Sequence, residues 1–275
     1  MRKFKLINAV GEEFDLMRKD AFFHAPDGLG FSFSNTYEKT GSEFIMVEEI
    51  ESQKGPSGEM VFASYEQYAE FTLFISKRPL KFLYMPLNRW AYLDVTVTNF
   101  QKSEMSQNGF LICPIDFTAS GRWYVPFTYE KKEHIGQGKK YSYDYDYTYA
   151  EMADGIFDID NKGTSESRTT LTIFGPIENP AWSLAVNNAT VLSGKVTASI
   201  IAGHKLVVCS KESEMRIMEY DVETGAVIQN LCQMQDWAKE NFITVPSGTS
   251  TLRVTGEGAE RVRAALEVYE TYDTV

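Results

Sequence analysis

The sequence changes character across Cys113-Pro-Ile-Asp-Phe-Thr-Ala-Ser-Gly-Arg-Trp-Tyr-Val-Pro126, a stretch that we call the seam. Before the seam lie apolar runs, loops and one stretch of helical period; after it come short alternating segments separated by Gly, Asn and Pro. The seam holds two prolines and a Trp-Tyr pair, which is typical of a stiff, packed connection rather than of a flexible Gly/Ser linker. We therefore predict two domains at a fixed angle, residues 1–128 and residues 129–275.

The composition is that of a globular protein of two ordinary domains. The chain has 275 residues, of which 43% are apolar and 24% are charged. It contains 15 Tyr and 18 Phe, and aromatic residues are enriched in strands. The composition thus favours a mainly β protein.

Both predicted domains are acidic. Residues 1–128 have a net charge of −3 and residues 129–275 have a net charge of −8. Proteins that grip duplex DNA need a surplus of Lys and Arg, so we expect no tight nucleic-acid binding.

Cysteine spacing and hydropathy indicate the cellular compartment in which the protein is made. The three cysteines, Cys113, Cys209 and Cys232, show no Cys-x-x-Cys spacing, so neither a disulfide framework nor a zinc site is indicated. The basic start Met1-Arg-Lys-Phe-Lys5 is followed by too short an apolar run for a signal peptide, and no run is long enough to span a bilayer. We expect synthesis in a reducing cytoplasm and no membrane partner.

The first domain is predicted to be antiparallel strands with one helix. Ser64 is a candidate N-cap with Gln67 at the capping-box spacing, and Tyr65, Tyr68, Phe71 (or Thr72) and Ile75 recur at helical intervals up to Lys77. The three aromatic residues share one face, which we predict to contact the core. Arg78-Pro79 should end this helix. Gln53–Glu59 is predicted to be a loop because it holds two Gly and a Pro. Strands are predicted at residues 4–10, 29–33, 44–47, 80–84 and 90–99.

The second domain is predicted to be a β-sandwich. Between Tyr141 and Tyr149 five tyrosines occupy every second place, which puts their rings on one face of a strand. These rings could stack on sugars, form an interface or pack against the neighbouring domain. From Gly155 onward short apolar segments recur about every ten residues, and Gln235–Asn241 could form one helical turn. The segments are residues 156–159, 171–174, 182–186, 196–201, 206–209, 217–220, 226–228, 242–245, 252–255 and 262–269.

No motif of catalysis or metal binding is complete. The stretch Asp158-x-Asp160-x-Lys162-Gly163 begins like a calcium loop, but Lys162 and Thr169 stand where ligands are needed, so we predict a strand-ending turn. Glycine-rich stretches at residues 55–59, 136–140 and 256–261 fail as a nucleophile elbow, a P-loop and a dinucleotide fingerprint. The histidines His24, His134 and His204 are not in metal-ligand spacing. We predict no catalytic, cofactor or metal site and thus a binding or assembly protein.

Three stretches together resemble the distal tail protein family of long-tailed, non-contractile bacteriophages. The first is Phe62–Tyr65 with Phe71, Phe74 and Ile75, followed by Leu80–Pro86 and Tyr92–Val97. The second is the seam, where Pro114–Phe117, Ser120 and Trp123-Tyr124 are similar to the family pattern, although Gly121-Arg122 replaces a common proline. The third is Asn161-Lys-Gly163 through Gly175–Pro180, with Gly248, Tyr272 and Val275.

This resemblance implies a structural virion protein at the distal end of a phage tail. It implies an N-terminal domain, residues 1–128, that forms a homo-hexameric ring, and a galectin-like β-sandwich, residues 129–275, that faces outward. The implied partners are the major tail tube protein, the tape-measure protein, and tail-associated and receptor-binding proteins.

The main alternative is a carbohydrate-binding adhesin of the tail tip that stacks sugars on Trp182, Trp237 or the tyrosine ladder. No sugar-binding signature surrounds Trp182, Trp237 or His204. We therefore expect the second domain to have little affinity for simple sugars.

Overall fold

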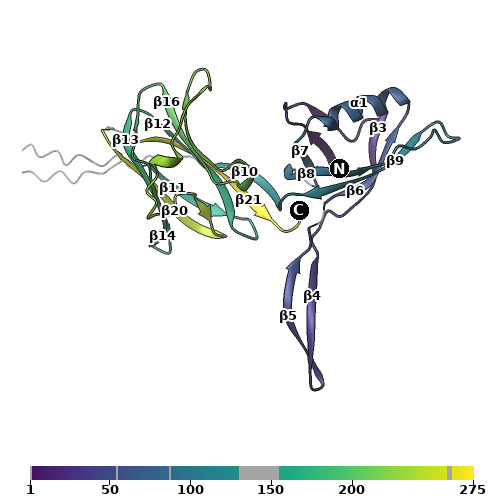
Figure 1. Cartoon of the computed structure of the whole chain (residues 1–275), viewed down its shortest axis with the longest axis horizontal. Coiled ribbons are helices and arrows are strands. Elements are labelled where there is room, and N and C mark those ends of the chain that lie inside the picture. The colour runs from purple at the N-terminus through teal and green to yellow at the C-terminus, as the bar shows by residue number, and fades with distance from the viewer. Residues whose placement is uncertain (1, 54, 87, 130–154, 259–261) are drawn as a thin grey trace, which may run out of the picture. The chain divides into compact units, whose positions relative to one another are not determined.

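The computed structural model describes residues 2–53, 55–86, 88–129, 155–258 and 262–275. Within it the chain forms two compact units, residues 1–125 with 272–275, and residues 126–271 (Figure 1). The first unit therefore ends at Val125, and it includes Tyr272–Val275, which we had assigned to the second domain. The tyrosine ladder and His134 lie outside the described residues.

The first unit is a rolled antiparallel sheet with one helix. Its strands lie in the order β3-β6-β9-β8-β7-β1-β2. The sheet closes on itself because Leu16 donates to the Phe4 carbonyl and accepts from the Phe23 amide, at 3.1 and 2.8 Å. The bounds are β1 Lys3–Ile7, β2 Glu13–Asp15, β3 Ala21–Asp27, β6 Ser57–Phe62, α1 Tyr65–Ser76, β7 Leu80–Met85, β8 Ala91–Phe100 and β9 Leu111–Ala119. Strand β10, Trp123–Tyr129, pairs with β8 at Tyr124 and continues past the end of the first unit.

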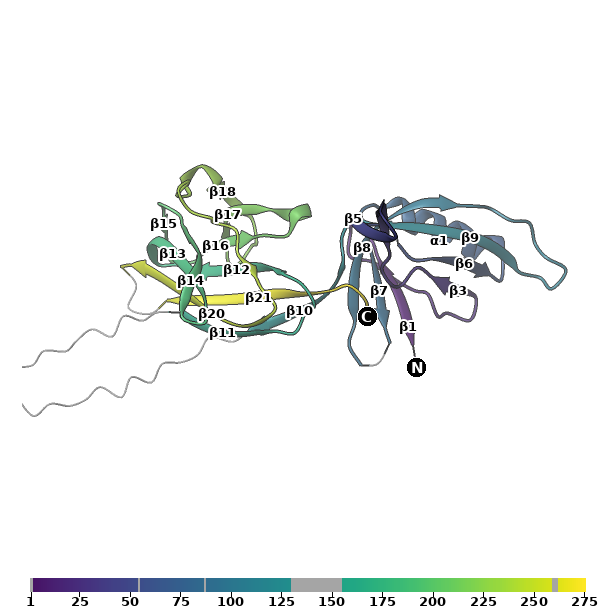
Figure 2. The same ribbon diagram turned by 90° about the horizontal axis from the view of Figure 1, so that it is seen from below.

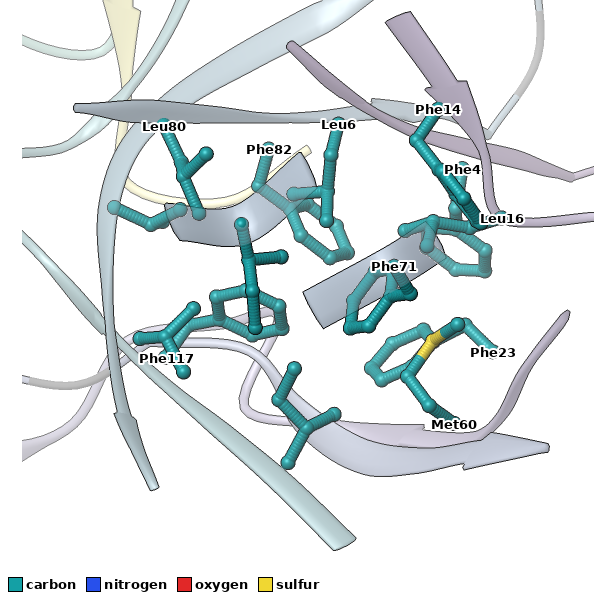
Figure 3. Close-up of a cluster of buried hydrophobic side chains, with 14 of the residues drawn as sticks. Phe4, Leu6, Phe14, Leu16, Phe23, Met60, Phe71, Leu80, Phe82 and Phe117 are labelled. Atoms are coloured by element: carbon teal, nitrogen blue, oxygen red, sulfur yellow. The ribbon is translucent and has the colours of Figure 1, made fainter. Parts of the chain in front are cut away.

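The core of the first unit is made of phenylalanines that meet at aromatic pair geometries. Phe4 and Phe23 contact edge to face with ring centroids 5.8 Å apart, and Phe82 and Phe117 do so at 5.5 Å. Figure 3 shows these side chains converging with Phe71 of α1. Such pairs add about 0.5–1.5 kcal/mol each beyond the burial of their area.

The helix begins and ends as the sequence predicts. Ser64 caps it by accepting the Glu66 amide, its hydroxyl also contacts the Gln67 amide oxygen, and the helix ends at Ser76, before Arg78-Pro79. Its buried residues are Phe71, Phe74 and Ile75. Tyr65 had been predicted on the same face but is exposed and donates to Glu104 at 2.7 Å.

Two predictions for the first domain are wrong in part. Residues 57–59 belong to strand β6 rather than to a loop. Gly58 fits this strand because a Cβ there would lie 2.8 Å from the Phe23 ring, so glycine permits a close approach of β3. Residues 29–32 are not strand, and the next strand begins only at Phe33.

The second unit is a β-sandwich of two sheets around one core (Figure 2). One sheet has the order β18-β17-β16-β12-β21 with β19 beside β12; the other has the order β11-β20-β13-β14 with β15 beside β13. The bounds are β11 Gly155–Asn161, β12 Ser167–Phe174, β13 Ile177–Val186, β14 Ala189–Lys195, β15 Ser199–Ile200, β16 His204–Cys209, β17 Arg216–Asp221, β18 Val227–Asn230, β19 Thr244–Val245, β20 Gly248–Glu257 and β21 Arg263–Tyr272.

Alternation of buried and outward residues explains these strands. In β12 every second residue from Ser167 to Ile173 is buried, as a strand with one face on a core requires. The structure differs at Val196–Ile201, where only Ser199–Ile200 is strand, and β14 had been missed. The short helical turn lies at Cys232–Met234 and not at Gln235–Asn241. β11 ends at Asn161, which agrees with the predicted strand-ending turn.

Candidate assembly surface: an exposed hairpin of the first unit

Strands β4 (Phe33–Thr40) and β5 (Glu43–Glu51) form a separate two-stranded sheet. They pair in antiparallel register through a two-residue turn in which Gly41 has a φ of +66°, as tight hairpin turns require. Figure 1 shows this hairpin reaching away from the rest of the first unit. All residues of both strands are exposed, so the hairpin packs on no core of its own chain.

The hairpin carries large apolar side chains on both faces. Cross-strand partners share a face, so Tyr37 lies with Met46, and Phe44 lies on that same side. Ile45 and Ile50 lie on the opposite side. The exposed fractions of these apolar residues range from 49% for Met46 to 67% for Phe44. An isolated hairpin is marginally stable in water, and exposed apolar area of this kind marks an interaction surface.

The hairpin is also strongly acidic. Residues 33–51 contain five glutamates and one lysine, a net charge of −4. The remainder of residues 1–128 has a net charge of +1. The acidity of the first domain thus lies in its hairpin, and a partner surface must offer apolar groups without a surplus of carboxylates.

The root of the hairpin is fixed to the body by polar contacts. Arg122 pairs with Glu51 at 2.5 Å and with Asp273 at 2.6 Å, and the bond to Glu51 raises the pKa of the Arg122 guanidinium. Gln53 Nε2 donates to the Ala119 carbonyl at 3.0 Å. Trp123 Nε1 donates to the carbonyl of Leu29 at 3.1 Å.

A cavity of about 370 Å³ lies at this root, beside the ion pairs of Arg122. Gly28 has a φ of +71°, and a Cβ there would lie 2.4 Å from the Gly55 carbonyl oxygen. Glycine at this position therefore lets the two chain segments that carry the hairpin lie against each other.

The structure excludes Trp182 from the residues suggested for sugar stacking. Trp182 is only 2% exposed, packs in the second core and donates to the Asn241 carbonyl at 3.2 Å, so its ring is not accessible to a sugar. Trp237 is 75% exposed. His204 is bonded to the buried Glu219 at 2.6 Å, and Gln229 donates to the other oxygen of that carboxylate.

The remaining candidate residues do not converge on a reactive site. Cys113 and Cys209 are buried free thiols and Cys232 is half-buried. His24 is exposed beside Glu59 at 3.3 Å. No group of three or more His, Cys, Asp or Glu that could hold a metal occurs among the described residues. Within the residue ranges that the structure describes, no helix is long and apolar enough to cross a membrane.

Comparison with known proteins assigns the first unit. Residues 3–120 match the family model described as distal tail protein, N-terminal domain. Residues 3–120 are thus a distal tail protein N-terminal domain. This domain places the protein at the distal end of a phage tail.

Solved structures of low sequence identity share the fold of the whole chain. A chain of the phage P2 baseplate in its activated conformation with Ca has a TM-score of 0.71 and 14% identity, and each chain is covered completely. The SPP1 Dit protein (gp 19.1), titled a paradigm of a hub adsorption apparatus in phages that infect Gram-positive bacteria, has a TM-score of 0.61 and 11% identity, with 97% of this chain and 98% of that chain covered. No curated protein matches the sequence.

The protein is thus mainly β and carries the N-terminal domain of a distal tail protein. From the sequence, only Phe33 and residues 44–47 of the hairpin were predicted as strand, with nothing to distinguish them from the other strands. The one signal that could have set it apart is the uninterrupted run Phe44–Val47 between glutamates, which an alternating half-buried strand would not show.

Proposed function

We propose that this protein is the distal tail hub and assembles as a homo-hexameric ring, in which the β4–β5 hairpin of each copy packs on the next copy. The observation that carries the proposal is the row of large apolar side chains on both faces of a hairpin that no part of its own chain covers. A ring needs two different surfaces on each subunit, and a hairpin that extends from the body supplies the first of them.

In this proposal the ring joins the tail tube and the tape-measure protein to the tail-associated and receptor-binding proteins. The distal tail protein domain in residues 3–120 supports this position. The role is structural and not enzymatic. The second unit, a β-sandwich that we propose to be galectin-like, faces outward and makes no ring contact.

The hairpin can be tested by substitutions that do not touch a core. The double variant Tyr37→Ser, Phe44→Ser removes two exposed rings, and Thr36→Ser is a matched control on the same strand. Light scattering and native mass spectrometry should give six times the chain mass of 31.2 kDa for the natural protein and the control. The double variant should stay monomeric with an unchanged circular dichroism spectrum. A hexamer of normal stability from the double variant would refute the role of the hairpin.

The assignment of the ring to residues 1–128 needs its own experiment. Dissecting the chain is unsuitable because Tyr272 and Val275 pack on the first core. Mixed ¹⁴N- and ¹⁵N-labelled protein can instead be cross-linked, so that links between copies are identified by mass. Such links should join residues of the first unit. Links between copies that occur only within the second unit would contradict the assignment.

A further inference from the structure

The five-stranded sheet of the second unit has one face on the core and one face away from it. Trp182, Leu184, Leu252 and Val254 are buried in the core, so the residues between them lie on the other face. A groove of about 700 Å³ lies on this sheet, a volume within the range of small-molecule sites. Its lining is mainly polar and includes Asp158, Asp160, Asn187, Asn188, Thr251 and Arg253.

The strand register explains why this face is hollow. Asp158, Thr251 and Ala185 stand directly opposite one another on β11, β20 and β13. The small side chains of Thr251 and Ala185 thus form the middle of the floor. Longer polar residues stand around them, with Asp158 and Asp160 on β11 at one side and the Asn187-Asn188 turn at the other. Both asparagines have positive φ, 50° and 65°, which the tight turn between β13 and β14 requires.

The lining favours a polar ligand over a protein partner. Its only apolar side chains are Ala185 and Ile159, and Ile159 is 2% exposed. Protein interfaces depend on buried aromatic or aliphatic anchors, and this groove offers none. Small multifunctional ligands need instead several donors and acceptors in one place, and the groove supplies amides, hydroxyls, carboxylates and a guanidinium.

The charges in the groove disfavour an anionic ligand. Two carboxylates, those of Asp158 and Asp160, stand against the single guanidinium of Arg253. Thr251 already donates to Asp158 at 3.4 Å, which holds that carboxylate toward the floor. An anion would meet a net negative site, whereas the hydroxyl groups of a sugar can both donate to the carboxylates and accept from the amides and the guanidinium.

We propose that this groove binds a neutral saccharide through hydrogen bonds to Asp158, Asp160, Asn187, Asn188 and Arg253. Because no aromatic ring lines the groove, stacking does not contribute, and we expect a Kd on the order of 1 mM for a single site. This differs from the sequence-based expectation of little sugar affinity, which considered only the surroundings of Trp182, Trp237 and His204. In the proposed ring several sites would bind a repeating saccharide with avidity, and only this last step rests on the proposed function.

The test is a saturation-transfer NMR titration of the full chain with a panel of oligosaccharides. The panel contains neutral members (maltotriose, cellotriose, chitotriose and lactose) and anionic members (sialyllactose and trigalacturonate). At least one neutral saccharide should bind saturably, and Arg253→Ala should weaken it at least tenfold. Thr251→Val removes one hydroxyl at constant shape and should weaken binding about threefold to tenfold, whereas Thr251→Ser should retain it. Ala185→Phe fills the floor and should abolish binding without disturbing the core face.

Two further variants make the result specific to the groove. Glu223→Gln changes an exposed carboxylate elsewhere in the second unit and should leave binding unchanged. Trp237→Ala should also have no effect. The proposal is overturned if no neutral saccharide binds saturably up to about 20 mM, if only anionic members bind, or if binding is lost in Trp237→Ala and retained in Arg253→Ala. Ring assembly is measured separately, so these outcomes leave the proposed function untouched.

Discussion

Asn161 is the residue of the second unit whose loss should be most damaging without changing the core. It is 2% exposed and stands at the end of β11. Its Nδ2 donates to the carbonyls of Val245 and Pro246 at 3.0 and 3.1 Å. Its Oδ1 accepts from the Gly163 amide and the Ser167 hydroxyl, both at 3.0 Å. One side chain therefore joins β11, the turn after it, β12 and the segment that follows β19.

The cost of Asn161→Ala follows from these four bonds. Each contributes about 1 kcal/mol net, so the four bonds together contribute about 4 kcal/mol. We expect the free energy of unfolding of the second unit to fall by about 4 kcal/mol. With a urea dependence of about 2 kcal/mol per molar, the midpoint should fall by about 2 M. Asn161→Asp should be at least as harmful, because it places a carboxylate oxygen against two carbonyl oxygens.

Unfolding must be followed in the second unit alone, since a chain of two units need not unfold in one step. Pulsed hydrogen exchange at increasing urea, read by mass spectrometry on peptides of β12 and β16, reports on that unit. Lys162→Ala, at the exposed neighbouring position, is the matched control and should change the free energy by less than about 0.5 kcal/mol. A midpoint shift below about 0.5 M for Asn161→Ala, or an Asn161→Asp variant as stable as the natural protein, would refute this reasoning.

Three further predictions concern single positions. Gly194→Ala should destabilise the second unit by about 1–3 kcal/mol in urea unfolding, because a Cβ there would lie 2.3 Å from the buried Trp182 indole, whereas Gly121→Ala, with open space around it, should be neutral. Arg122→Ala should speed amide exchange at the hairpin root but cost less than about 1 kcal/mol, since its ion pairs are partly exposed. Burial raises the pKa of Tyr129 to about 12, so the contribution of this group to stability should be constant below pH ~10 and be lost toward pH ~12, and Tyr129→Phe should remove this part of the alkaline slope in denaturation curves.

Local sequence signals predicted the elements that depend on neighbours in the chain. The helix is defined by Ser64 at one end and Arg78-Pro79 at the other, and both ends were confirmed. Strands β7 and β8 follow from apolar period and length in the same way. Strand β6 was misjudged at Ser57–Glu59, because its glycine is required by a ring that lies 35 positions earlier in the chain. Propensity shows the conformational freedom of Gly58 but not the neighbour that uses it.

The two candidate sites were hidden for a different reason. The run Phe44–Val47 has the composition of a buried strand, and only the structure shows that its own chain leaves it exposed. The groove on the five-stranded sheet is made from residues on four strands that are up to 95 positions apart, from Asp158 to Arg253. Asp158, Thr251 and Arg253 are each an ordinary outward position of their own strand, and Asn187-Asn188 form an ordinary hairpin turn. Cross-strand register brings them together, and register is not readable from one segment at a time.

The distribution of charge connects the hairpin with assembly. The net charge of −3 on residues 1–128 is the sum of −4 on residues 33–51 and +1 on the rest, and Asp273, which belongs to the first unit, brings that rest to zero. The bodies of neighbouring copies therefore do not repel one another through net charge. An acidic hairpin that reaches from one copy to the next meets a body without net charge, so net charge does not oppose this contact and the apolar side chains can supply its strength. The same division of charge keeps hairpins apart from one another, which directs each hairpin to a neighbouring body and favours closed assembly over hairpin-to-hairpin aggregation.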